Sequence, residues 1–355
     1  MPIWTMAFPL IGLLAVMAAL ADKGAAATTV AVVLLFGCVL SAVHQAEVVA
    51  HRIGEPFGTL VLAVAVTVIE VSLIVSIMLS DNGEASSSLA RDTVFAAIMI
   101  ILNFIVGICI LTGGVHHHEQ QFTLKGVNAA LCVLVAMATF SLVLPNYTAS
   151  TSGPTLSTPQ LVFVAAVSLI LYLTFVMVQT IRHRDYFLPA EAPAAEDVHA
   201  PPPPNRTAVA AFAVMLVALV VVVLLAKALS ATVETAVLGA GLPLTIVGVV
   251  IAALVLAPES LAAYRAARLN RLQTSLNLAL GSALATIGLT IPSVAVVSLF
   301  LDLPLTLGLD PKSLVLLLLS VFVTSLTLAT GRTTVLQGTV HLVIFATYLF
   351  VSVVP

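Results

Sequence analysis

Two glutamates stand alone in long apolar stretches, and they are the residues of this sequence best placed to do chemistry. Glu70 lies within residues 57–79 and Glu259 within residues 243–264, and neither stretch contains a Lys, Arg or Asp. An ionised side chain in hydrocarbon costs about 2.5–3.5 kcal/mol on insertion scales, so such residues usually mark ion or proton pathways. The pair therefore predicts a site that binds cations, protons or both.

Small and polar residues share a helix face with each glutamate. Thr67 and Glu70 are three residues apart, and Gly248, Ala252 and Glu259 recur at helical spacing. Helix faces lined with small residues also allow helices to approach closely, and such packing is an alternative explanation for the small residues. Close packing alone does not require a carboxylate, so we expect Glu70 and Glu259 to be functional.

Further oxygen atoms come from two other apolar stretches. Ser282 lies in a stretch rich in Ser and Thr, and Asn103 lies in another apolar run. These side chains are candidates to complete a cation coordination shell, although hydrogen bonding between helices is an equally good explanation. Pro258 is expected to free carbonyls near Glu259 or simply to kink its helix, and Pro292 is expected to break its helix.

The composition is that of a membrane protein that crosses the bilayer many times. The chain has 355 residues, of which 61% are hydrophobic and 8% charged, against about 25% charged residues in soluble domains. Its net charge of −3 argues against binding nucleic acid. A helix needs about 20 apolar residues to cross a bilayer. Eleven segments are candidates: 3–21, 28–46, 57–79, 93–113, 124–144, 160–181, 207–230, 243–264, 274–300, 312–330 and 333–353.

The basic residues predict how these segments are oriented. On the side that holds the N-terminus are Arg52, Lys125, Arg182, Arg184, Arg206, Arg265, Arg268, Arg271 and Arg332, whereas the other side has Lys23, Arg91, Lys227 and Lys312. Because cytoplasmic loops carry the excess of Lys and Arg, we expect a cytoplasmic N-terminus and an external C-terminus in the plasma (inner) membrane.

A polar linker divides the chain. Residues 182–206 are rich in Pro, Ala and acids and read as a flexible cytoplasmic linker. We therefore expect an N-terminal helix (1–27), a five-helix repeat (28–181), the linker and a second five-helix repeat (207–355). Five is odd, so the two copies insert with opposite topology, as in many secondary transporters. Gly54-Glu55-Pro56 precedes the Glu70 segment and Gly241-Leu242-Pro243 precedes the Glu259 segment, which supports the repeat, although chance similarity between apolar helices is an alternative.

Other polar residues have simpler explanations. Glu47 and Glu234 occupy matching places before the two segments, either as entrance or relay groups or as ordinary interfacial residues. His116-His117-His118 could sense pH or bind a metal, but a solvated loop is the simpler interpretation. The sequence contains no zinc-protease, nucleophile-elbow or Walker motif, which argues against an enzyme or an ATP-driven pump.

The segments 54–79, 91–111 and 247–292 together resemble the Ca²⁺/cation antiporter superfamily, and within it the ChaA-type cation/proton antiporters of bacteria. The resemblance implies an all-α membrane protein with two inverted repeats and an acid from each repeat at the ion site. By that motif Glu70 and Glu259 match the acidic positions, and Ser282 matches the serine of a Gly-Ser motif. Val66-Thr67 and Val255-Leu256 stand where many members have Gly-Asn, so a weaker or differently selective Ca²⁺ site is implied.

Charge balance leads to a mechanism. Burial raises the pKa of a carboxyl group in general, so a buried Glu can exchange a proton for a metal near neutral pH. One Ca²⁺ or two protons neutralise two carboxylates equally well, whereas the empty charged site is costly to move. We expect export of Ca²⁺ in exchange for H⁺, with Na⁺ or K⁺ as possible substrates and no cofactor. The alternatives are a carrier for a small organic solute and a membrane scaffold or sensor that transports nothing.

Overall fold

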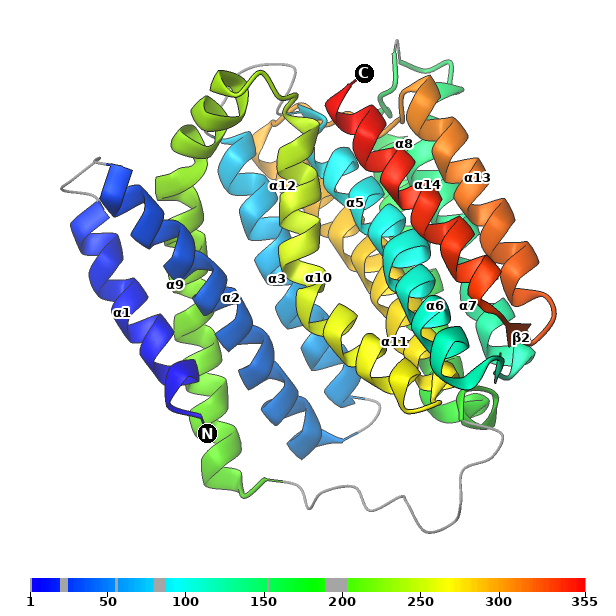
Figure 1. Cartoon of the computed structure of the whole chain (residues 1–355). Coiled ribbons are helices and arrows are strands. Elements are labelled where there is room, and N and C mark those ends of the chain that lie inside the picture. The colour runs from blue at the N-terminus through cyan, green and yellow to red at the C-terminus, as the bar shows by residue number, and fades with distance from the viewer. Residues whose placement is uncertain are drawn as a thin grey trace. The chain divides into compact units, whose positions relative to one another are not determined.

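The computed structural model describes residues 2–19, 25–54, 57–79, 87–151, 153–188 and 203–354, and almost all regular structure in them is helical. The elements are α1 (Ile3–Ala19), α2 (Ala25–Ile53), α3 (Phe57–Met78), α5 (Leu89–Met99), η1 (Ile100–Ile105), α6 (Val106–His117), β1 (Gln120–Gln121), α7 (Leu124–Ala138), η2 (Thr139–Val143), η3 (Leu144–Asn146), α8 (Thr158–Met177), η4 (Val178–Arg182), η5 (Arg184–Phe187), α9 (Asn205–Gly239), α10 (Thr245–Arg268), α11 (Leu272–Ala285), η6 (Thr286–Thr290), α12 (Ile291–Leu301), α13 (Pro311–Leu328), β2 (Arg332–Thr333) and α14 (Val335–Val353). The predicted all-α membrane architecture is confirmed (Figure 1).

Ten of the helices in the described residues are long and apolar enough to cross a membrane. They coincide with ten of the eleven predicted segments, and the first predicted segment forms α1, which has only 17 residues. The main differences are at helix ends. Helix α9 runs to Gly239 because no Gly or Pro interrupts it earlier, and α2 continues to Ile53, where Gly54 adopts a φ of 75° that ends the helix.

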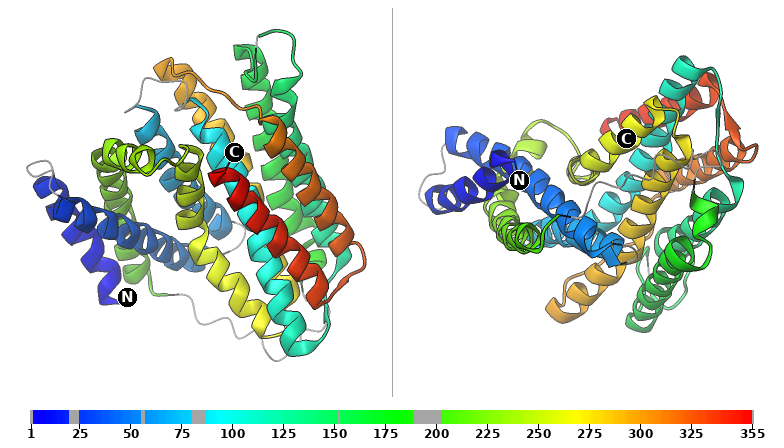
Figure 2. Two further views of the ribbon diagram at one scale, coloured as in Figure 1. Left: turned by 45° about the horizontal axis from the view of Figure 1, so that its top comes forward. Right: turned by 90° about the horizontal axis from the view of Figure 1, so that it is seen from below.

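The chain folds as two compact units, and each is described by itself. Unit 1 comprises Met1–Leu89 and Ala195–Val247, and in it α2 lies beside α1, α3 and α9. Unit 2 comprises Ala90–Ala194 and Gly248–Pro355. Figure 2 shows the segments of both units from two further directions. Each unit takes segments from both sides of the linker, so the units do not follow the division at 182–206. That division stays a prediction, and residues 189–202 lie outside the described part of the chain.

Local irregularities recur in the two halves of the sequence in the same order. Gly54 before α3 and Gly241 before α10 both have positive φ, at 75° and 70°. The third predicted helix of each half contains a π turn: η1 lies in the segment predicted at 93–113, and η6 lies in the segment predicted at 274–300. Each of these helices then ends at a residue with positive φ, His118 at 64° and Asp302 at 53°. The predicted repeat therefore has a counterpart in the backbone.

The two prolines expected to interrupt helices are accommodated differently. Pro292 does not break its helix, because the π turn η6 comes immediately before it and α12 continues to Leu301. Helix α10 likewise continues through Pro258 without an unwound segment, although its axis changes direction along its length (Figure 1). Since proline has no N–H, the carbonyl of Leu254 receives no helical hydrogen bond from residue 258.

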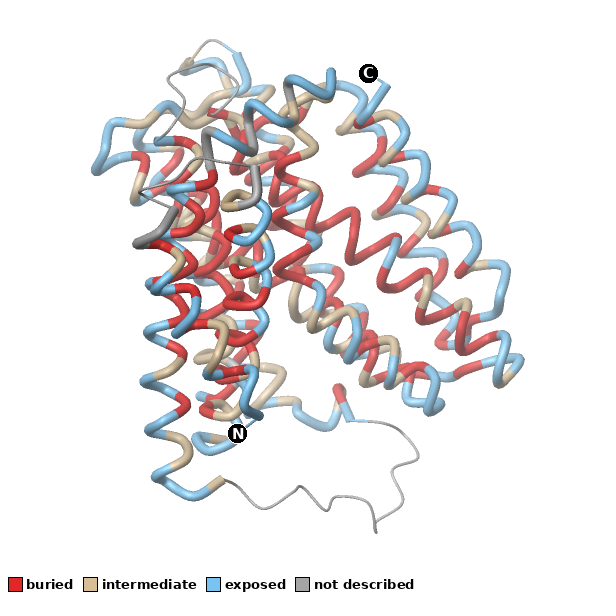
Figure 3. The backbone as a smooth tube through the Cα atoms, turned by 60° about the vertical axis from the view of Figure 1, so that its left-hand side comes forward, coloured by how far each residue is buried: buried red, intermediate tan, exposed pale blue. Residues whose placement is uncertain are grey.

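Most helices alternate buried and exposed residues along their length (Figure 3). The helix formed by α5, η1 and α6 is the exception, because most of it is buried. Within unit 2 it packs against α11, α13 and α14. The two strands add only a short antiparallel pair, in which Gln120 lies opposite Thr333.

Candidate cation site

Unit 1 contributes Glu70 and Thr67, both on α3. Their exposed fractions are 2% and 6%, so both lie inside the protein. The Thr67 hydroxyl donates to the Ala63 carbonyl one turn earlier at 2.8 Å, which leaves its oxygen available as an acceptor. At the start of α3, a side chain on Gly58 would run into the Ala50 carbonyl of α2, so this glycine allows the two helices to meet.

Unit 2 contributes Glu259 on α10 and Ser282 on α11, and both are half-buried. The Ser275 hydroxyl of α11 donates to the Ala263 carbonyl of α10 at 2.9 Å, which ties the two helices together. At the other end of α10, a Cβ on Gly248 would lie 2.9 Å from the Thr93 nitrogen of α5. Helix α10 is therefore held against α5 near its start and against α11 near its end, with Glu259 between these points.

The corner between α10 and α11 is held by a short segment that follows α6. Gln120, which is 1% exposed, donates from Nε2 to the Ala267 carbonyl at 2.9 Å and to Asn270 Oδ1 at 3.0 Å. A ring nitrogen of His117 lies 3.0 Å from the Arg268 carbonyl. The Thr123 nitrogen donates to Gln273 Oε1 of α11 at 2.6 Å. The Ala267 carbonyl also accepts from the Asn270 nitrogen at 3.1 Å, so Gln120 adds a second partner to a carbonyl at the end of α10.

We expect Gln120→Ala to loosen the α10–α11 corner and to reduce transport by about tenfold, because two buried hydrogen bonds worth roughly 1 kcal/mol each are lost. Hydrogen exchange at residues 264–272 would report the loosening without reference to transport. A side chain on Gly113 would collide with the Gln120 amide oxygen. Gly113→Ala should therefore impair the wild type but be tolerated in the Gln120→Ala background, and additive effects of the two changes would contradict this coupling.

Asn103 lies in η1 and is completely buried. Its Nδ2 donates to the Ser320 hydroxyl of α13 at 2.9 Å. The amide group of this side chain is thus already engaged with α13, and its place in the cation site stays a prediction. Helical spacing in the sequence could not predict which neighbouring helix the Asn103 side chain faces, because the π turn η1 shifts the helix face on which Asn103 lies.

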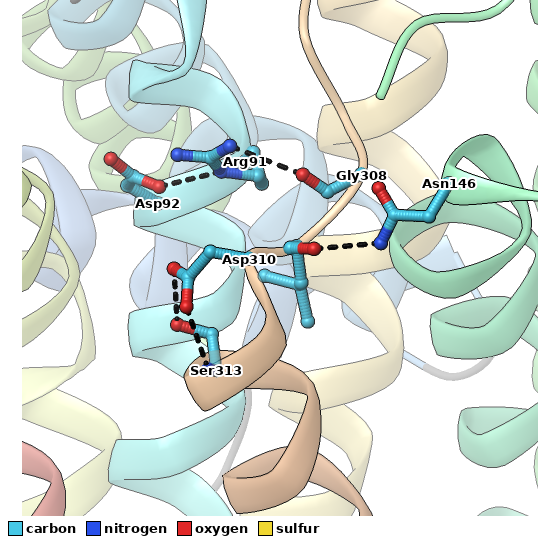
Figure 4. A network of polar contacts seen from close by, with 7 residues as sticks. Arg91, Asp92, Asn146, Gly308, Asp310 and Ser313 are labelled. Atoms are coloured by element: carbon cyan, nitrogen blue, oxygen red, sulfur yellow. Dashed lines mark hydrogen bonds and ion pairs between the residues drawn. The ribbon is translucent and has the colours of Figure 1, made fainter. Parts of the chain in front are cut away.

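A second polar network, which the sequence did not reveal as a unit, holds another part of unit 2 together (Figure 4). Arg91 pairs with Asp92 at 2.7 Å and donates to the Gly308 carbonyl at 3.1 Å. Asn146 donates to the Leu309 carbonyl at 2.6 Å, and Asp310 accepts from the Ser313 nitrogen at 3.0 Å at the start of α13. The Asp-Pro pair at 310–311 is the one local signal of this network, because it is typical of a helix N-terminus.

The other polar residues singled out in the sequence have ordinary surroundings. Glu47 lies 3.8 Å from His44 one turn away on α2, and the Glu234 side chain lies outside the described part of the structure. His116 contacts the Thr112 carbonyl, at 2.8 Å. Within the described ranges, no group of three or more His, Cys, Asp or Glu side chains is placed to hold a metal ion.

Comparison with known proteins decides the family. The model of the family described as "Sodium/calcium exchanger protein" matches residues 23–181 and 210–354. The chain belongs to this exchanger family. It is therefore an integral membrane protein of a transporter family, and the resemblance to the Ca²⁺/cation antiporter superfamily is confirmed.

Individual relatives of this exchanger agree with the assignment. It is 46% identical to the y4hA protein of Sinorhizobium fredii (strain NBRC 101917 / NGR234), over 100% of this chain and 97% of that one. It is 32% identical to the sodium-potassium/proton antiporter ChaA of Escherichia coli (strain K12), over 90% of this chain and 86% of the other. The solved structure of YfkE, a Ca²⁺/H⁺ antiporter protein, shares the fold with a TM-score of 0.75 and 17% identity, and the match covers 99% of this chain and 100% of that one.

Proposed function

We propose that this exchanger is a secondary active cation/proton antiporter that exports Ca²⁺ in exchange for H⁺, with Na⁺ and K⁺ as further candidate substrates. The observation that carries the proposal is the pair of carboxylates on corresponding helices of the two halves, Glu70 on α3 and Glu259 on α10. The relatives support proton-coupled exchange, since ChaA is named a sodium-potassium/proton antiporter and YfkE a Ca²⁺/H⁺ antiporter.

In this proposal Glu70 and Glu259 bind the cation and the protons in turn. A doubly charged Ca²⁺ and two protons each neutralise the two carboxylates, so either loaded form is cheaper to move through a low-dielectric region than the empty form. This difference obliges exchange instead of leak. Thr67 and Ser282 supply neutral oxygen atoms, which Ca²⁺ accepts as ligands beside carboxylates.

The remaining assignments belong to the same proposal. The protein lies in the plasma membrane with its N-terminus and linker in the cytoplasm and its C-terminus outside, as the distribution of Lys and Arg indicates. The chain is organised as a helix at 1–27, repeats at 28–181 and 207–355, and a linker at 182–206 between them. Its partners are lipid, cations and protons, and no nucleic acid.

Reconstitution in liposomes tests the function directly. Purified protein is placed in vesicles with a pH gradient, and proton flux is followed after Ca²⁺, Na⁺, K⁺ or Mg²⁺ is added separately. We expect proton flux with Ca²⁺, and flux with Na⁺ or K⁺ would identify those ions as substrates. Silence with every cation, in vesicles shown to contain folded protein, would reject the proposal.

A further inference from the structure

Four connections between helices meet at one end of unit 2 and make that end strongly basic. They are residues 118–125, 182–188, 264–273 and 329–334, which together contain seven Lys or Arg residues and two acids. Gln120 lies opposite Thr333 in the strand pair and donates to the Ala267 carbonyl, so three of the connections are in direct contact. At the other end of unit 2, residues 91–92 and 302–312 contain two basic residues and three acids.

An excess of Lys and Arg is common at the cytoplasmic surface of membrane proteins, so a binding site needs a local arrangement as well. The segment Arg182–Leu188, which includes η5, provides one. Asn277 of α11 donates from Nδ2 to the Phe187 carbonyl at 2.5 Å, and Phe187 itself is 6% exposed. A Cβ on Gly126 would lie 2.5 Å from the carbonyl oxygen of Tyr186, so α7 lies directly against this segment. The segment is therefore fixed on α7 and α11.

The fixed segment gathers cations around one aromatic ring. The Lys125 ammonium group of α7 lies 5.0 Å from the centre of the Tyr186 ring, and the His183 ring stacks on Tyr186 with the two ring centres 4.7 Å apart. Arg182 and Arg184 flank His183 in the chain, and both are exposed, as is Lys125. These five residues, Lys125, Arg182, His183, Arg184 and Tyr186, are called the η5 cluster.

Acidic residues do not cancel the charge of the η5 cluster. Asp185 is the one acid in the segment 182–188, against two arginines there and Lys125 beside Tyr186. The other acid at this end of unit 2, Glu119, lies 3.6 Å from Arg332. The cluster thus keeps a net positive charge that can attract an anion.

An apolar stripe of α8 leads to this cluster. Ile170, Leu173, Met177 and Ile181 are between 45% and 65% exposed, and they recur every three or four residues along one side of the helix. In a bilayer such a stripe faces the hydrocarbon, and it ends directly before Arg182. The η5 cluster therefore lies at the depth where the phosphates of the lipid headgroups begin.

We propose that the η5 cluster binds the phosphate of an anionic phospholipid, whose acyl chains lie along the exposed stripe of α8. Arg and Lys are the side chains best suited to phosphate, and basic residues at the membrane surface attract anionic lipids. A zwitterionic lipid carries the same phosphate together with an ammonium group, which the cluster repels. A soluble phosphate has no acyl chain for the stripe. The site does not depend on which cation is transported, but its location in the cytoplasmic leaflet rests on the proposed orientation.

Native mass spectrometry of the full chain, released from detergent, tests the site by counting bound lipids. Phosphatidylglycerol and phosphatidylcholine with identical acyl chains are added separately, and the affinity for the first bound molecule is measured. We expect the wild type to prefer phosphatidylglycerol. Changing both Arg182→Gln and Arg184→Gln should weaken phosphatidylglycerol binding by at least about tenfold, and Lys125→Gln by about fivefold, with phosphatidylcholine binding unchanged.

Matched variants separate a site from a diffuse field. Arg206→Gln removes an exposed charge on the same predicted side but in unit 1, and Lys312→Gln removes one at the other end of unit 2, so both should bind phosphatidylglycerol like the wild type. Arg182→Lys together with Arg184→Lys should retain most of the preference, because the charge is kept.

Three results would overturn the proposal. The first is equal affinity of the wild type for the two lipids. The second is a loss in Arg206→Gln as large as that in the double glutamine variant, which would show that the lipid responds to overall charge. The third is binding of glycerol phosphate, without lipid, as tight as that of phosphatidylglycerol, which would make the cluster a site for soluble anions.

Discussion

Glu259→Gln abolishes cation-driven proton flux in liposomes, and Glu70→Gln does the same: this is the largest functional effect that we expect. Glutamine keeps the size and polarity of glutamate but removes its negative charge and its proton. If the negative charge contributes about 3 kcal/mol to binding the cation, its loss should lower the rate of exchange by about a hundredfold or more. Flux with Ca²⁺, Na⁺ and K⁺ would be measured in turn for each variant.

A matched charge removal controls for surface effects. Glu119→Gln makes the same change at an exposed residue that pairs with Arg332 at 3.6 Å, and this variant should transport at the wild-type rate. Both site variants should elute and melt like the wild type, because an uncharged amide is cheaper to bury than a carboxylate. Normal flux in Glu259→Gln would show that the cation binds elsewhere, whereas loss in Glu70→Gln alone would assign the site to α3.

The helices were predictable because the membrane imposes their composition. A segment that spans hydrocarbon must be apolar over about 20 residues, and this requirement is visible in any one sequence. The two carboxylates were conspicuous for the same reason, since nothing else in their segments is charged. What composition does not encode is how α2, α3 and α9 join in one unit while α10 and α11 join in another. That grouping depends on contacts between residues far apart in the chain.

Asn103 illustrates the limit for the site. A polar residue in an apolar run is a sound candidate for a site, but the side of the helix on which the Asn103 side chain lies depends on the π turn η1. A π turn inserts one extra residue, which rotates every following position by about 100° around the helix axis. Local sequence did not predict this turn, so helical spacing could not tell which neighbour Asn103 meets. The hydrogen bond from Gln120 to the end of α10 could not be predicted from local sequence either, because Gln120 and Ala267 are 147 positions apart in the chain.

Gly338→Ala is the substitution that we expect to destabilise the fold most. A Cβ at this position would lie 2.5 Å from the Leu111 nitrogen and 2.8 Å from the Gly107 oxygen, both backbone atoms of α6. Backbone atoms cannot rotate away as a side chain can, so α14 must move outward from α6. Overpacking of this kind costs about 1–3 kcal/mol and exceeds the gain of up to about 1 kcal/mol from the better helix propensity of alanine.

Gly281→Ala provides the matched control, because a Cβ there meets no described atom within 4 Å. Denaturation by increasing SDS, followed by circular dichroism, should show a lower free energy of unfolding for Gly338→Ala and an unchanged or slightly higher one for Gly281→Ala. Both are Gly→Ala changes inside helices, so their difference isolates the close contact between α6 and α14 from propensity. Equal stabilities would mean that this contact does not hold α14 in place.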